Sequence, residues 1–124
     1  MDKNEWMRKI KAACKKAGTY QTQFNYVIET LAQIMEDRDK AHEQYVQTGS
    51  HPTIVHTNKA KEQNIVKNPM LVMELDLNAQ ALAYWRDLGL TPAGLKKLNA
   101  DAVKAEKNAP GSFERFLDGL SSDG

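Results

Sequence analysis

The chain has 124 residues and a net charge of +1, and 41% of its residues are apolar while 27% are charged. These proportions are typical of one small globular domain, and no apolar run approaches the ~18 residues of a membrane helix. The polar start lacks the apolar stretch of a secretory signal, and the single cysteine cannot form an internal disulfide, so we expect a soluble, cytoplasmic protein with no membrane partner.

Charge is distributed unevenly along the chain. Residues 1–16 carry six basic and two acidic side chains, whereas residues 17–50 carry two basic and five acidic ones. Residues 51–69 are basic again, with three lysines and one glutamate. A basic segment on a nearly neutral chain fits a contact with nucleic acid. It fits a solvated helix face equally well, and composition alone leaves both interpretations open.

The first element is a predicted helix over residues 1–18. Its apolar side chains, from Trp6 to Ala17, recur at helical spacing, and the lysines fall largely on the opposite side. Gly18 stands where a left-handed residue ends many helices. Because lysine and arginine neutralise phosphates, we predict that this basic face contacts DNA. Its members are Arg8, Lys9, Lys11, Lys15 and Lys16.

A second, long helix is predicted over residues 20–48, because apolar side chains recur at helical spacing and neither Gly nor Pro interrupts them. At 1.5 Å per residue it would be roughly 40 Å long. A small domain cannot bury so long an apolar stripe by itself, so this helix needs a long partner helix or another subunit.

Residues 52–67 contain two short β-rich runs around a polar stretch. This pattern predicts a β-hairpin or a pair of extended arms. Its basic residues, Lys59, Lys61 and Lys67, are a second candidate for DNA binding. The rival interpretation is that this element pairs with a neighbouring subunit.

A third helix is predicted over residues 69–88, where Asn68 can act as N-cap and Pro69 suits the first helical position. Its apolar stripe is unusually wide, which predicts a broad buried face. Thr91 and Pro92 then open a short helix whose Lys96 and Lys97 are a third, weaker DNA candidate.

Residues 99–124 are predicted to be a linker followed by a C-terminal helix. The apolar face of that helix either docks on a partner or folds back onto the chain's own core. It consists of Phe113, Phe116, Leu117 and Leu120.

The expected fold is mainly α: a long antiparallel helix pair with a small β-hairpin or extended arm inserted between the helices, and short N- and C-terminal helices. Residues 1–98 would form the DNA-recognition and oligomerisation domain, and residues 99–124 the partner-binding part. Apolar surface left over from the helix pair would make the contact between subunits. The predicted interface residues are Phe24, Leu31, Tyr45, Ile54, Val55, Ile65, Val66 and Trp85.

Catalytic and metal sites are not expected. The spacing of His42, His51 and His56 matches no zinc site, and Cys14 has no histidine in its segment to activate it. Neither a P-loop nor a dinucleotide-binding glycine pattern occurs. We therefore predict a protein that is not an enzyme and binds no metal or cofactor.

Several segments, taken in order and spacing, resemble a known family. They are Tyr45-x-x-x-Gly49, His56-Thr57-Asn58-Lys59-Ala60, Asn64-Ile65-Val66-Lys67-Asn68-Pro69, the stretch from Ala81 to Pro92, and Ala93-Gly94-Leu95-Lys96-Lys97-Leu98. Across roughly residues 20–99 the chain is similar to the P27-like small subunits of bacteriophage terminase. The turn Leu88-Gly89-Leu90-Thr91-Pro92 after a long helix is the most specific of these elements.

This resemblance implies a non-catalytic protein that recognises double-stranded viral DNA at its packaging site in the host-cell cytoplasm. It also implies a homo-oligomeric ring, and delivery of the DNA to the large terminase subunit, which supplies the ATPase and the nuclease. Two other functions remain open. One is a helical oligomeric adaptor that does not bind DNA and acts through its apolar faces. The other is a small helix-turn-helix regulator, although the helix after Pro92 is short for DNA recognition.

Overall fold

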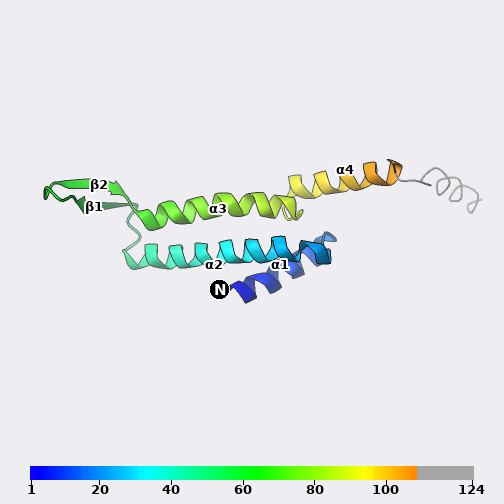
Figure 1. Ribbon diagram of the computed structural model, residues 1–124, viewed down its shortest axis with the longest axis horizontal. Coiled ribbons are helices and arrows are strands. Elements are labelled where there is room, and N and C mark those ends of the chain that lie inside the picture. The colour runs from blue at the N-terminus through cyan, green and yellow to red at the C-terminus, as the bar shows by residue number, and fades with distance from the viewer. Residues whose placement is uncertain (109–124) are drawn as a thin grey trace, which may run out of the picture.

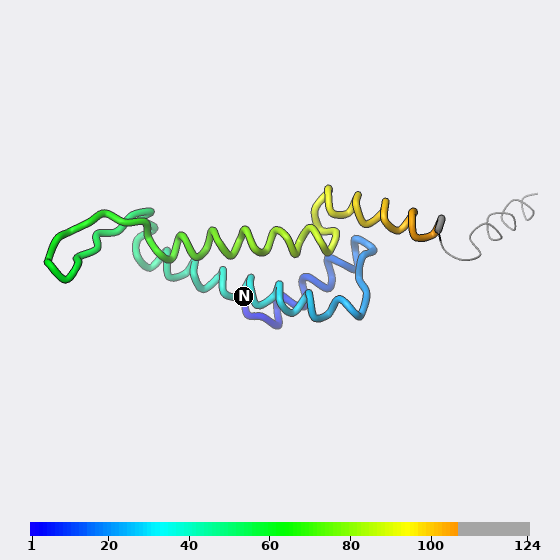
Figure 2. Tube along the Cα trace, turned by 45° about the horizontal axis from the view of Figure 1, so that its top comes forward, coloured from blue at the N-terminus to red at the C-terminus, as the bar shows by residue number. Residues whose placement is uncertain are grey.

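The computed structural model describes residues 1–108 (Figure 1). Its elements are the helices α1 (Lys3–Ala17), α2 (Asn25–Gln47), α3 (Pro69–Asp87) and α4 (Pro92–Asn108), the 3-10 turn η1 (Thr22–Phe24), and the strands β1 (Thr53–Thr57) and β2 (Gln63–Lys67). Helices α2 and α3 lie side by side and antiparallel, and α1 packs on α2 (Figures 1 and 2). The hairpin projects from one end of this pair and α4 from the other. The mainly α fold, with a hairpin between two long antiparallel helices, is therefore confirmed.

Helix α1 begins and ends at residues with suitable capping chemistry. The Asp2 side chain accepts a hydrogen bond from the backbone N–H of Glu5 at 2.8 Å, which satisfies one of the free donors in the first turn. Gly18 ends the helix with φ 76° and donates to the carbonyls of the last turn. Between the caps, Ile10 and Cys14 are buried against the rest of the chain.

Helix α2 is the centre of the molecule because it has a neighbouring helix on two sides. Its buried residues are Ile28, Leu31, Ala32, Met35 and Ala41. The same hydrophobic core takes in Ile10 of α1 and Ala81 of α3. The predicted helix over residues 20–48 is thus present, although its first turn is the separate 3-10 turn η1.

Helix α3 begins as predicted, with the Asn68 side chain accepting from the backbone N–H of Met70 at 3.1 Å and a proline in its first turn. The prediction of a broad buried face, however, is wrong for the single chain. Ala81 is the only fully buried residue between Pro69 and Asp87. The reason is that, within residues 1–108, no second layer covers the sides of α3 that α2 leaves open. The exposed apolar residues of α3 are Val72, Met73, Leu75 and Leu82.

The junction between α3 and α4 is tightly packed. A Cβ atom on Gly94 would overlap the carbonyl oxygen of Arg86, and the Thr91 hydroxyl accepts from the backbone N–H of Gly94 at 3.0 Å. Helix α4 then continues to Asn108, so residues 99–108 are helical and not the predicted linker. They contain three Ala and two Lys, which favour helix, and no Gly or Pro. The predicted C-terminal helix lies outside the described residues.

None of the helices within residues 1–108 combines the length and the apolar character that a bilayer span requires.

Candidate nucleic-acid interface

The outer face of α1 carries the chain's main group of basic side chains. Because α1 turns Ile10 and Cys14 toward the core, the residues about half a turn away point outward. Four of the five predicted DNA-binding residues of α1 are exposed and Lys11 is half-buried. Within residues 1–108 none of the five forms an ion pair with a carboxylate. We call this set, Arg8, Lys9, Lys11, Lys15 and Lys16, the basic face of α1.

Lys3 differs from these residues, since its charge is used inside the chain. Its Nζ lies 2.8 Å from an Oε1 of Glu29, and its backbone N–H donates to Glu36 at 2.6 Å. The side chain of Trp6 donates to Asp39 at 2.7 Å. The start of α1 is therefore held on α2 partly by carboxylates. Among the later lysines, Lys15 places its Nζ 5.1 Å from the centre of the Tyr20 ring.

These contacts also shift the ionisation of the α2 carboxylates. The backbone N–H of Lys3, together with the Lys40 side chain, lowers the pKa of Glu36. A hydrogen bond and charge attraction from Lys3 lower the pKa of Glu29. Both carboxyl groups therefore favour the charged form, in which they accept these hydrogen bonds most strongly, and they add to the apolar contact between α1 and α2.

The hairpin carries the second basic group at the other end of the molecule. Lys59, Lys61 and Lys67 are all exposed. The hairpin follows the C-terminal end of α2, whereas α1 leads into its N-terminal end, so the two basic groups lie toward opposite ends of the α2–α3 pair (Figure 1). A single copy does not gather them into one continuous patch.

Lys96 and Lys97 are exposed on α4, near the end of the molecule where α1 finishes. The connection is direct, because the Thr19 hydroxyl, just after α1, donates to the carbonyl of Leu88 at the end of α3 at 2.7 Å. Sequence spacing does not reveal that these lysines share an end with the basic face of α1, since about 80 residues separate the two segments.

The predicted oligomer-interface residues fall into two groups. Those on the hairpin are accessible: Val55, Ile65 and Val66 are exposed and Ile54 is half-buried. Those on the helices contribute to the chain's own packing. Phe24 and Trp85 pack against the core, with the rings of Trp85 and Trp6 centred 6.4 Å apart. The half-buried Tyr45 donates its hydroxyl to the carbonyl of Ser50.

Leu31 requires a correction. It has no exposed surface, because it faces the core from the middle of α2, and a neighbouring chain has nothing of it to contact. We therefore leave it out of the proposed interface.

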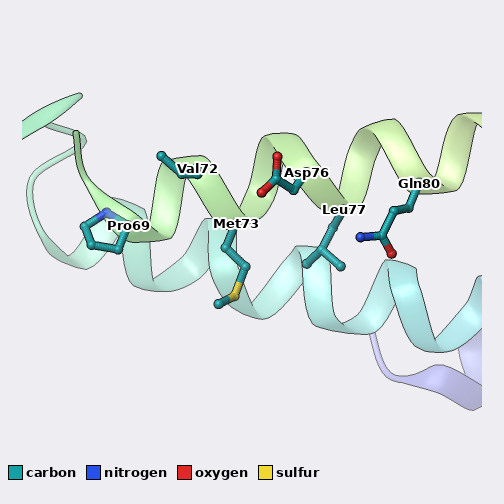
Figure 3. Close-up of a pocket in the computed structure, with 6 residues that line it drawn as sticks. All are labelled: Pro69, Val72, Met73, Asp76, Leu77 and Gln80. Carbon is teal, nitrogen blue, oxygen red and sulfur yellow. The ribbon is translucent and has the colours of Figure 1, made fainter.

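An exposed apolar groove on α3 was not predicted from the sequence. It has a volume of about 420 Å³ and opens along the first three turns of the helix. Figure 3 shows its lining side chains, which are Pro69, Val72, Met73, Asp76, Leu77 and Gln80. The available signal was the width of the apolar stripe, which exceeded what one neighbouring helix can cover.

The side chains that could bind a metal or act as a nucleophile lie apart from one another or are buried within the described residues. No group of three or more His, Cys, Asp or Glu side chains there could hold a metal ion. His42 instead lies 2.9 Å from a carboxylate oxygen of Glu74. Burial raises the pKa of the Cys14 thiol, which keeps it in the unreactive, protonated form. The predicted partner-binding residues Phe113, Phe116, Leu117 and Leu120 lie outside residues 1–108.

The chain matches a known protein family over most of its length. Residues 3–105 match the family described as phage terminase, small subunit. No curated protein and no solved structure matches the chain. The family match runs from the first turn of α1, through both long helices and the hairpin, and into α4. The chain therefore belongs to the phage terminase small-subunit family, and its role is in phage genome packaging.

Proposed function

We propose that this protein is the DNA-recognition subunit of a phage packaging motor, of the P27-like type. In this proposal it binds double-stranded phage DNA at the packaging site, assembles into a ring, and delivers the DNA to the large terminase subunit in the host-cell cytoplasm. The large subunit supplies the ATPase and the nuclease, and this chain catalyses no reaction. The C-terminal apolar residues from Phe113 to Leu120 are the proposed contact with the large subunit.

The observation that carries the DNA-binding proposal is the basic face of α1. Five basic side chains share one side of a rigid helix, and none has a carboxylate partner within residues 1–108. Charges arranged in this way can each neutralise a phosphate and release its counterion. The lysines of the hairpin are the second proposed contact.

One copy offers few phosphate contacts, so assembly matters to affinity. When several copies sit on the same DNA, each later contact forms at a high effective concentration. A ring of weakly binding subunits can therefore hold DNA firmly. The exposed apolar side chains of α3 and of the hairpin support such assembly, because contiguous apolar surface exposed to water is typical of a protein–protein interface.

The test is DNA binding measured over a series of salt concentrations, with a duplex that carries the packaging site. Replacing four lysines of the basic face, Lys9, Lys11, Lys15 and Lys16, by Gln should lower affinity and flatten its salt dependence. The slope of log affinity against log salt should fall by ~0.9 for each lysine that contacts a phosphate. Circular dichroism and particle mass would show that fold and assembly are retained.

A matched control compares two pairs of adjacent lysines. Lys15→Gln with Lys16→Gln should reduce the salt slope, whereas Lys96→Gln with Lys97→Gln should change it less. If the four-lysine variant keeps the affinity and salt slope of the unchanged protein, the basic face does not bind DNA.

The alternative function is a helical oligomeric adaptor that does not bind DNA. The specific observation in its favour is the exposed apolar surface of α3, which suits a protein partner. An adaptor of this kind would assemble normally and show no salt-dependent affinity for duplex DNA, even at low ionic strength.

A further inference from the structure

The groove on α3 is apolar except for one acidic residue and one amide. Val72, Met73 and Leu77 form its apolar part, and Asp76 lies among them (Figure 3). Met73 is 48% exposed, and Asp76 forms no ion pair with any residue between 1 and 108. The groove therefore presents an apolar surface with one negative charge available for a partner.

The hairpin has the complementary character and lacks a packing partner of its own. Every residue of β1 and β2 is exposed except Ile54, which is half-buried. In the antiparallel register, Val55 faces Ile65 and Thr53 faces Lys67. Alternation along a strand puts these residues on the same side of the hairpin. A two-stranded hairpin with no packed face is marginally stable in water, so a covering partner would stabilise it.

The chain's own hairpin is held away from its own groove. Buried Asn68 donates from its side chain to the Thr48 hydroxyl at 2.9 Å and to the carbonyl of His51 at 3.0 Å. Its backbone N–H closes the base of the hairpin on the carbonyl of Pro52 at 2.8 Å. With this base anchored, the hairpin extends beyond the end of α3 in both views (Figures 1 and 2). A hairpin that occupies the groove must then belong to another chain.

The dimensions of the two surfaces agree. Each strand has five residues and is about 17 Å long at ~3.3 Å per residue. The groove runs from Pro69 to Gln80, which corresponds to about 17 Å of helix at 1.5 Å per residue. A hairpin laid along α3 would cover the groove from end to end.

Charge also matches. The hairpin and its loop carry three lysines and one glutamate, whereas α3 carries three acidic residues and one arginine. Lys67 shares a hairpin face with Val55 and Ile65, just as Asp76 shares the groove with Val72 and Met73. Apolar contact and one opposite-charge pair would thus form together, which gives the contact a defined direction.

From these features we propose that the hairpin face formed by Val55, Ile65 and Lys67 in one copy docks in the α3 groove of a second copy, with Lys67 beside Asp76. Each copy presents both a hairpin and a groove, so the contact joins two different patches, and copies linked head-to-tail in this way can close into a ring. The inference rests on the proposed function, since it specifies how the subunits would assemble. It assigns Lys67 to the subunit contact and leaves Lys59 and Lys61 as the hairpin's DNA candidates.

A complementation experiment tests the pairing. Ile65→Glu removes the donor surface and Met73→Glu removes the acceptor surface. Ile65 is 78% exposed and Met73 48%, so the fold should survive. Each variant alone should self-associate at least about tenfold more weakly than the unchanged protein, as measured by sedimentation. An equal mixture should form heterodimers, because it contains one intact hairpin and one intact groove. Val103→Glu, a matched change at a 52% exposed residue of α4, should leave assembly unchanged.

A charge-reversal series tests the register. Asp76→Lys should weaken assembly about tenfold, and adding Lys67→Asp to the same chain should restore it to within about threefold of the unchanged protein. Lys61→Asp in place of Lys67→Asp should not restore it, because Lys61 lies in the loop and not on the docking face.

Three results would overturn the proposal. If Met73→Glu alone assembles normally while Ile65→Glu does not, hairpins pair with hairpins. If the reverse holds, grooves pair with grooves. If the mixture stays monomeric, the two surfaces do not meet. Failure of the proposed function gives a different result, because the mixture of variants still forms heterodimers. If the unchanged protein then shows no salt-dependent DNA binding, the DNA-binding part of the proposed function is wrong. If it stops at a closed dimer, the ring is wrong.

Discussion

Helices α2 and α3 lie side by side, yet they bury very different shares of their apolar residues. Helix α3 is the more apolar of the two, but Ala81 is its only fully buried residue, whereas α2 buries five. The difference follows from their neighbours. Helix α2 is covered by α1 on one side and by α3 on the other, while most of α3 faces α2 alone. Apolar periodicity marks a face as able to be buried, and the number of adjacent elements decides whether it is.

The largest expected effect contrasts a leucine of α2 with one of α3. Leu31→Ala should lower the free energy of unfolding by about 3 kcal/mol, because it opens a cavity in the core. Leu82→Ala, at an exposed position of α3, should change it by less than ~0.5 kcal/mol. Urea unfolding at protein concentrations that keep the chain monomeric would measure both. Equal losses would show that α3 is already covered within one chain.

A smaller effect is expected at the start of α3, which is held by hydrogen bonds more than by apolar burial. Asn68 is 1% exposed, caps the helix and anchors the base of the hairpin. Asn68→Ala should cost about 2 kcal/mol of unfolding free energy, since it removes a helix cap and the other two side-chain hydrogen bonds of a buried residue. Asn78→Ala, at an exposed site of the same helix, is the control. Hydrogen exchange should show the hairpin base opening in the first variant, and unchanged protection there would contradict this role.

The smallest effect concerns how α1 is attached to α2, and it appears at low pH. The folded-state pKa of Glu36 lies below its ordinary value of 4.5, chiefly because the backbone N–H of Lys3 donates to it. A carboxylate with a lowered pKa contributes stability above its unfolded pKa and loses it as the pH falls through the folded value. Stability should therefore decline below about pH 4.5, and Glu36→Gln should make this decline shallower.

Glu43→Gln is the control for that experiment, because Glu43 is exposed on α2 and forms no ion pair within residues 1–108. Amide exchange followed element by element gives the sharper measurement. On acidification, protection should fall in α1 before it falls in α3. If α3 loosens first, carboxylates do not control the attachment of α1.

Much of the fold could be predicted from local chemistry. Asp2, Gly18, Asn68 and Pro69 mark helix ends through hydrogen-bond capping and restricted backbone angles, which neighbouring residues determine by themselves. The hairpin and the side of α1 that carries its lysines followed from alternation and helical spacing. The end of α4 was placed too early, because Ala- and Lys-rich sequence fits both a solvated helix and a linker.

The candidate site was only partly predictable, for a different reason. The sequence by itself determined which residues share a face: the basic face of α1, the apolar stripe of α3 and the paired residues of the hairpin. Only the tertiary structure decided which faces are covered. It buried Leu31, left Met73 in an open groove, used the charge of Lys3 within the chain and directed the hairpin away from α3. Periodicity is a local property of one segment, whereas burial depends on contacts between segments far apart in the chain.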